Sequence, residues 1–140
     1  MVICKTILIL EDDLRTLSKL LDKLFILEQD QPYDFSLIVL TNYQQVENYI
    51  NNNPKAEFDV VLLDRDCKLG GSFHTLDIER FGPEKVIAIS SVPEYNKEAE
   101  KRGVKRVVHK DFKELDKFVD KVIKEVKRMV TPSRLCNLIK

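Results

Sequence analysis

Short runs of apolar residues alternate along the chain with longer segments in which apolar residues recur every three or four positions. The short runs predict strands that are buried on both faces of a sheet. These runs lie at residues 6–10, 35–40, 58–63, 86–89 and 104–108. Charged residues interrupt the fifth run, so we expect that strand to lie nearer an edge of the sheet.

The longer segments have the spacing of amphipathic helices. They lie at residues 14–27, 43–50, 73–81, 94–102 and 111–129. Gly103 suits a left-handed cap at the end of the fourth helix, and Pro132 ends the fifth. In the fifth helix Asp111 and Glu114 predict a capping box, and an apolar stripe begins at Phe112.

Strands that alternate with helices predict crossover connections and therefore a parallel sheet covered by helices on both faces. In such sheets ligands bind at the carboxyl ends of the strands, near the point where the strand order reverses. The residues that follow each predicted strand are therefore the first candidates for a functional site.

Composition narrows the classes of partner and compartment. The 140 residues fit one domain, and 23 basic residues balance 23 acidic ones, so we expect neither nucleic acid nor a membrane as a partner. The first apolar run stops at Glu11, which no signal peptide or membrane span would tolerate. Three cysteines without zinc-type spacing indicate reduced thiols, and we expect a cytoplasmic protein.

Acidic, hydroxyl and basic side chains follow four of the predicted strands. These are Glu11, Asp12 and Asp13 after the first strand, Asp64, Arg65 and Asp66 after the third, Ser90 and Ser91 after the fourth, and His109 and Lys110 after the fifth. Each signal alone is weak, since an acid after a strand is commonly a helix cap, which is the role we expect for Asp13. Arg65 either pairs with the charge of Asp66 or is exposed.

The mixture of groups points to phosphoryl chemistry. Carboxylates that converge in one crevice raise each other's pKa unless a cation joins them, and Mg²⁺ prefers carboxylate oxygens together with water and phosphate. A carboxylate is also a nucleophile toward phosphorus. The oxygens of a transferred phosphoryl group need the metal, a cationic side chain and a hydrogen-bond donor, and Lys110 and Ser90 are groups of the right kind.

Four segments, ILILEDD, VVLLD, VIAISS and VVHK, resemble the receiver domain of two-component response regulators, across about residues 4 to 130. The resemblance implies a flavodoxin-like, doubly wound, five-stranded parallel sheet in the order 2-1-3-4-5. It implies a receiver domain over residues 1–130 and a short tail over 131–140 with no output domain.

The resemblance also implies the roles of individual residues. Asp64 would be the phosphoacceptor, and Glu11, Asp12, Asp64 and the backbone carbonyl of Asp66 would bind Mg²⁺. Ser90 and Lys110 would stabilise the phosphoryl group. The phosphoryl donor would be a sensor histidine kinase or a phosphotransfer protein, and the signal would pass to a downstream protein. Such a stand-alone receiver is no enzyme beyond Mg²⁺-dependent self-phosphorylation and slow self-dephosphorylation.

Three positions depart from the family pattern. Asp111 stands where a proline usually follows the lysine, and Lys68 stands where the loop after the acceptor usually has a proline. Val107 occupies the switch position that is normally aromatic. We therefore expect the signal to run through the loop at residues 90–96 and the helix after it, with little response around Val107, whose branched side chain is stiff.

Two alternatives stay open at this point. The first is a degenerate receiver that binds partners without phosphorylation. The second is a phosphatase of the haloacid-dehalogenase type, because the segment VVLLDRDCKLG resembles its first motif, with Asp64 as nucleophile and Asp66 as general acid/base. Lys68 in place of that motif's threonine, and the two strands that precede the motif, favour the receiver.

Overall fold

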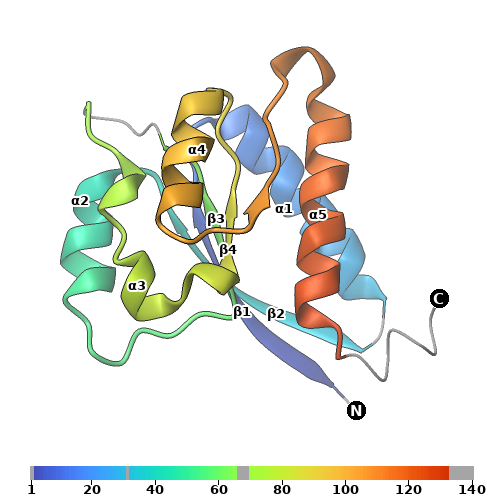
Figure 1. Ribbon diagram of the computed structural model, residues 1–140. Coiled ribbons are helices and arrows are strands. Elements are labelled where there is room, and N and C mark those ends of the chain that lie inside the picture. The colour runs from blue at the N-terminus through green and yellow to red at the C-terminus, as the bar shows by residue number, and fades with distance from the viewer. Residues whose placement is uncertain (1, 31, 66–69, 133–140) are drawn as a thin grey trace.

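A computed structural model describes residues 2–30, 32–65 and 70–132 of the chain. A parallel sheet lies at its centre, with the strand order β2-β1-β3-β4-β5 (Figure 1). The strands are β1 (Ile3–Leu10), β2 (Tyr33–Leu40), β3 (Val60–Leu63), β4 (Val86–Ala88) and β5 (Arg106–Val107). The predicted flavodoxin-like topology is therefore confirmed, and β5 lies at an edge, as its interrupted apolar run suggested.

Alternate residues of the inner strands enter two separate hydrophobic cores, one on each face of the sheet. In β1, Ile7 and Ile9 belong to the core under α1 (Leu14–Gln29) and α5 (Leu115–Val130). Their neighbours Leu8 and Leu10 belong to the opposite core. Because both faces are buried, the inner strands are continuously apolar, which is why the sequence pattern was readable.

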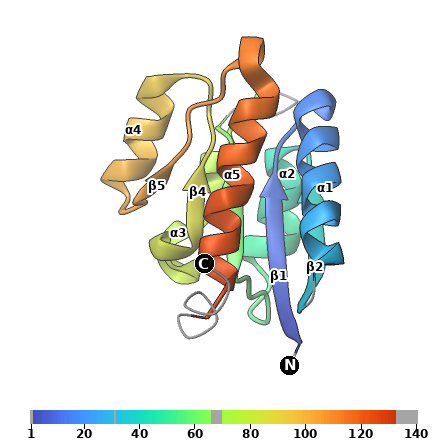
Figure 2. The ribbon, with the colours of Figure 1, turned by 90° about the vertical axis from the view of Figure 1, so that its right-hand side faces the viewer.

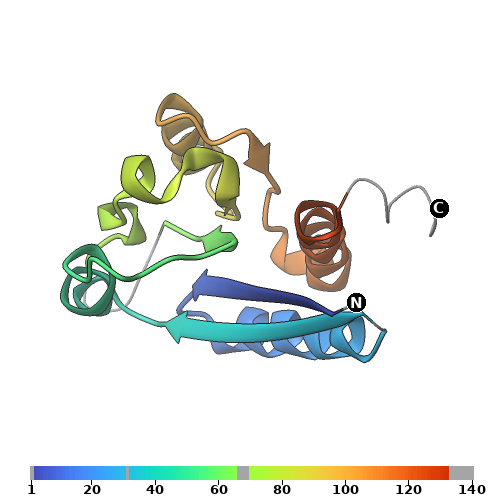
Figure 3. The same ribbon diagram turned by 90° about the horizontal axis from the view of Figure 1, so that it is seen from below.

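The helices are distributed over the two faces as the crossovers require, and the view from below shows the layers (Figure 3). On the second face lie α2 (Tyr43–Gln45), α3 (Ile78–Phe81) and α4 (Pro93–Lys101). On the first face α1 and α5 run side by side (Figure 2). Two ion pairs, Lys19 with Asp116 and Lys23 with Asp120, join these two helices at the surface.

The helix predicted over residues 73–81 is broken into two short pieces. A 3-10 turn, Phe73–Thr75, is followed by α3, and Asp77 caps α3 by accepting a hydrogen bond from the backbone N–H of Arg80 at 3.2 Å. The prediction of one helix was wrong because Asp77 satisfies a new helix start inside the segment. The second predicted helix also differs, since a π-helical turn, Val46–Asn51, follows α2.

The capping box predicted for the last helix is absent from the described structure. Asp111 caps a 3-10 turn, Phe112–Glu114, by accepting from the N–H of Lys113, and α5 begins one residue after that turn. The Glu114 side chain instead pairs with Lys117 on the surface. Phe112, expected to begin the buried stripe, is 49% exposed because it precedes the helix proper.

Two other predicted caps are confirmed. The Asp13 carboxylate accepts a hydrogen bond from the backbone N–H of Thr16 at 3.0 Å and so caps α1, directly after the acidic pair. Gly103 has a φ of 99°, in the left-handed region that glycine adopts without strain.

No helix in residues 2–30, 32–65 and 70–132 is long and apolar enough to cross a membrane.

Candidate functional site at the carboxyl edge of the sheet

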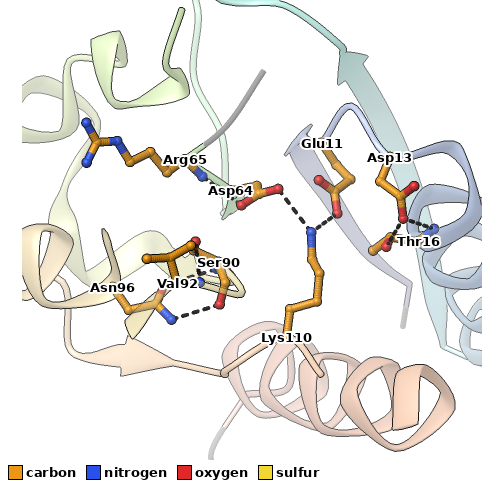
Figure 4. Close-up of polar contacts among 9 residues, drawn as sticks. All are labelled: Glu11, Asp13, Thr16, Asp64, Arg65, Ser90, Val92, Asn96 and Lys110. Carbon is orange, nitrogen blue, oxygen red and sulfur yellow. Dashed lines mark hydrogen bonds and ion pairs between the residues drawn. The ribbon is translucent and has the colours of Figure 1, made fainter. Parts of the chain in front are cut away.

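The polar residues that follow the strands meet in one crevice at the carboxyl edge of the sheet (Figure 4). Glu11 directly follows β1, and Asp64 directly follows β3. Ser90 follows β4 by two residues, and Lys110 follows β5 by three. Backbone bonds extend the sheet pairing into the site, since the N–H of Asp64 donates to the carbonyl of Leu10 at 3.1 Å.

Lys110 lies between two carboxylates at the centre of the crevice. Its Nζ donates to Glu11 Oε1 at 2.5 Å and to Asp64 Oδ2 at 3.0 Å (Figure 4). The side chains of all three residues are less than a tenth exposed. The backbone N–H of Lys110 donates to the Ser90 carbonyl at 3.1 Å, so the two loops that carry Lys110 and Ser90 are fixed to each other.

Three carboxylates come close enough to share one cation. Glu11, Asp12 and Asp64 each offer an oxygen, and these oxygens lie within 4.8 Å of one another. The second carboxylate oxygen of Glu11, Oε2, is buried and has no hydrogen-bond partner among the described residues. A buried oxygen without a partner costs free energy, and a hard divalent cation such as Mg²⁺ would satisfy it. The residues present therefore fit such an ion.

The crevice brings three acidic side chains together with the ammonium of Lys110, and this imbalance affects their pKa values. Burial, followed by the neighbouring Asp64 carboxylate, raises the pKa of Glu11 to about 9. Burial and the charge of Asp64 also raise the pKa of Asp12. Burial favours the neutral form of Lys110, but its attraction to Glu11 and Asp64 outweighs this, and the pKa of Lys110 is raised. Lys110 is thus, among the described residues, the single basic side chain beside these three acidic ones.

The acceptor candidate is held by both of its oxygens. Asp64 Oδ1 accepts from the backbone N–H of Arg65 at 2.8 Å, and Oδ2 accepts from Lys110. Ser90 is 1% exposed, and its Oγ accepts from the N–H of Val92 at 3.1 Å, which leaves the hydroxyl proton free to be donated elsewhere. The structure thus gathers five of the predicted residues, whereas Asp66 lies outside the described residues.

Sequence reasoning missed one residue that supports the site. Asn96, on the buried side of α4, accepts from the N–H of Ser90 and donates to the carbonyl of Ser90, both at 3.0 Å. The Asn96 side chain thus satisfies both backbone groups of Ser90, as a neighbouring strand would. These two bonds fix the loop after β4 to α4. A lone asparagine inside a predicted helix gives no local signal of such a role, although a buried amide must find partners.

The structure also corrects the expectation for Arg65. Its side chain is partly exposed, and its guanidinium pairs with Glu98 on α4, 33 positions further along the chain, at 2.7 Å. The predicted switch position, Val107, lies on β5 and is partly buried against the core under α2, α3 and α4.

Comparison with known proteins gives a result for structure and none for sequence. No protein-family model and no curated protein matches the sequence. The structure is similar to the phosphorylated cyanobacterial phytochrome response regulator RcpA, with 14% identity, 90% of this chain and 93% of that chain covered, and a TM-score of 0.67.

Two further solved structures show the same likeness. The Mn²⁺-bound response regulator Rcp1 has 18% identity, with 92% of this chain and 99% of that chain covered and a TM-score of 0.69. A response regulator receiver domain from Rhodospirillum rubrum has 17% identity, with 91% and 96% covered and a TM-score of 0.65. With its sheet order, its acidic cluster and these structural neighbours, the chain has the fold of a response-regulator receiver domain.

Proposed function

We propose that the protein is a phosphorylatable receiver, which accepts a phosphoryl group on Asp64 in the presence of Mg²⁺ and signals by binding a partner. The observation that carries the proposal is the position of the Asp64 carboxylate. It accepts a hydrogen bond from the ammonium of Lys110 and lies close to the two acids Glu11 and Asp12, in a crevice built from the ends of separate strands. A structural ion pair would need Lys110 and one acid, not three.

The proposed reaction moves one phosphoryl group. An Asp64 oxygen forms a bond to phosphorus while the bond from phosphorus to the donor breaks, so the donor leaves with its electron pair and Asp64 becomes an acyl phosphate. Lys110, which already contacts Asp64, neutralises charge on the phosphoryl oxygens, and Ser90 donates its hydroxyl proton to one of them. Mg²⁺, held by Glu11, Asp12 and Asp64, would supply further positive charge.

We further propose that the donor is a histidine kinase or a histidine phosphotransfer protein. Two large apolar side chains flank the crevice and face solvent. Leu14, 62% exposed, opens α1 directly after the acidic residues, and Phe112 lies with its ring centroid 5.6 Å from the Lys110 ammonium. Exposed apolar groups beside a reactive carboxylate suit a protein donor that must dock before transfer, rather than a diffusing small molecule.

The test is phosphorylation by a small donor. Acetyl phosphate with Mg²⁺ should add the mass of one phosphoryl group, and alkali should remove it, as it does from an acyl phosphate. Asp64→Asn should abolish the addition. Asp34→Asn, the same change at an exposed position on β2, is the matched control and should leave it intact. A phosphorylated Asp64→Asn protein, or an unlabelled wild type, would refute the proposal.

The acetyl phosphate experiment, together with beryllofluoride binding and a phosphatase assay, separates the alternative functions. A degenerate receiver would take up neither the phosphoryl group nor beryllofluoride, which mimics it. A phosphatase would release phosphate from a generic monoester through many turnovers, whereas the receiver is expected to show none. The proposed receiver would show one label on each chain and slow loss of that label.

A further inference from the structure

Arg65, the residue next to the candidate acceptor, reaches across to α4. Its guanidinium lies 4.0 Å from the centroid of the Tyr95 ring, and its Nη1 donates to Glu98 Oε2 at 2.7 Å. Tyr95 and Glu98 are three positions apart on α4 and so lie on the same face of the helix. Arg65 therefore holds this face of α4 by stacking and by charge together.

The backbone of Arg65 is fixed at the acceptor itself. Its N–H donates to Asp64 Oδ1 at 2.8 Å, and its carbonyl accepts from the N–H of Phe73 at 2.9 Å. Phe73 is fully buried, so this end of Arg65 is anchored in the core. The side chain of Arg65 extends away from the Asp64 carboxylate (Figure 4), so this one residue contacts both that carboxylate and α4.

A second connection ties the same helix to the other side of the site. Asn96 on α4 makes two hydrogen bonds to the backbone of Ser90, whose hydroxyl is the proposed donor to the phosphoryl group. The two contacts of Arg65 are partly solvent-exposed, with side-chain exposures of 31% for Arg65 and 46% for Glu98. The Asn96 bonds are buried. The contacts of Arg65 with α4 are thus easily rearranged, whereas the bonds of Asn96 to Ser90 are rigid.

We propose that Arg65 is a positioning residue that couples Asp64 to α4 through Tyr95 and Glu98, so that the face of α4 reports the state of the acceptor. The inference rests on the proposed phosphorylation of Asp64. A phosphoryl group adds negative charge to the residue next to Arg65, and this charge would draw the guanidinium from Glu98 back toward Asp64. At the same time it draws on the Ser90 hydroxyl, and Asn96 transmits that movement to α4. This route needs no aromatic residue at Val107.

Amide hydrogen exchange across α4, with and without beryllofluoride and Mg²⁺, tests the coupling. We expect a clear change in exchange over Pro93–Lys101 in the wild type. Arg65→Ala and Glu98→Gln should each respond clearly less than the wild type, and the remaining change is the part that Asn96 transmits. The double variant should lose no more than Arg65→Ala alone, because Arg65→Ala already removes the ion pair with Glu98.

Two further variants separate coupling from general damage to the helix. Glu100→Gln removes the same charge from an exposed position on α4 and should keep the full response. Arg65→Lys keeps a charge for Glu98 but lacks the flat group that stacks on Tyr95, so its response should be intermediate. Fluorine NMR of bound beryllofluoride should show that every variant still occupies the site.

The outcomes distinguish the two proposals. If the wild type binds no beryllofluoride and takes no phosphoryl group, the proposed function fails and the coupling fails with it. If all variants bind beryllofluoride but Arg65→Ala and Glu98→Gln keep the wild-type response of α4, the coupling through Arg65 is wrong while the proposed function stands. Equal losses of the α4 response in Glu98→Gln and Glu100→Gln would also overturn the proposed coupling.

Discussion

Replacement of Lys110 by methionine tests whether the crevice is organised by one buried cation. Methionine has a similar length, so Lys110→Met removes the charge without opening a large cavity. Removing one partner of a buried ion pair costs roughly 3–5 kcal/mol, because the other charge stays buried. The pKa of Glu11 is raised to about 9, so Glu11 contributes little negative charge at neutral pH. We therefore expect a loss near the lower limit, about 3 kcal/mol.

Urea unfolding at pH 7, with and without Mg²⁺, measures this loss. Mg²⁺ would replace the missing positive charge, so the gain in unfolding free energy on adding Mg²⁺ should be larger in Lys110→Met than in the wild type. Lys19→Met is the matched control, since Lys19 contacts Asp116 at a similar 2.7 Å but on the surface, and its loss should be much smaller. If both variants lose the same free energy, or if Mg²⁺ stabilises Lys110→Met no more than the wild type, the electrostatic account of the crevice is wrong.

Three other predictions address the acids. The pKa of Glu11 is raised to about 9 in the folded protein, above its value in the unfolded chain. Without Mg²⁺ the free energy of unfolding should therefore fall by up to ~1.4 kcal/mol per pH unit as the pH rises from about 5 to about 9. Glu11→Gln should flatten this slope in urea titrations. Asp12→Asn should abolish Mg²⁺ binding in calorimetry while Asp34→Asn keeps it, and equal binding by both would remove Asp12 from the metal site. Asp13→Ala should cost about 1 kcal/mol through the lost cap of α1, and Asp22→Ala, at an exposed position on the same helix, should cost clearly less in thermal unfolding; equal losses would argue against the cap.

The architecture was predictable because the sheet is buried on both faces. Continuous apolar runs identify its strands, and alternation with helices leaves few topologies. The same logic located the site, since the carboxyl ends of parallel strands must meet at one edge. Glu11, Asp64 and Lys110 could therefore be grouped before any coordinates, although they are far apart in the chain.

The rest depended on contacts that carry no periodic signal. The break before α3 follows from the local cap at Asp77, and the late start of α5 follows from a 3-10 turn that Asp111 caps. The pairing of Arg65 with Glu98 spans 33 positions, and the bonds of Asn96 join α4 to the buried backbone of Ser90. These are outcomes of tertiary packing, which propensity and spacing do not encode.

Chemical identification of the phosphorylated side chain tests the central claim most directly. Borohydride reduces an acyl phosphate to an alcohol, so an aspartyl phosphate is converted to homoserine at the position that carried the phosphoryl group. After treatment with acetyl phosphate and Mg²⁺, followed by borohydride and proteolysis, peptide mass spectrometry should find homoserine at position 64 alone, and only when Mg²⁺ was present. Homoserine at Asp12 or Asp66, or no homoserine in a protein that is folded and saturated with Mg²⁺, would contradict the account.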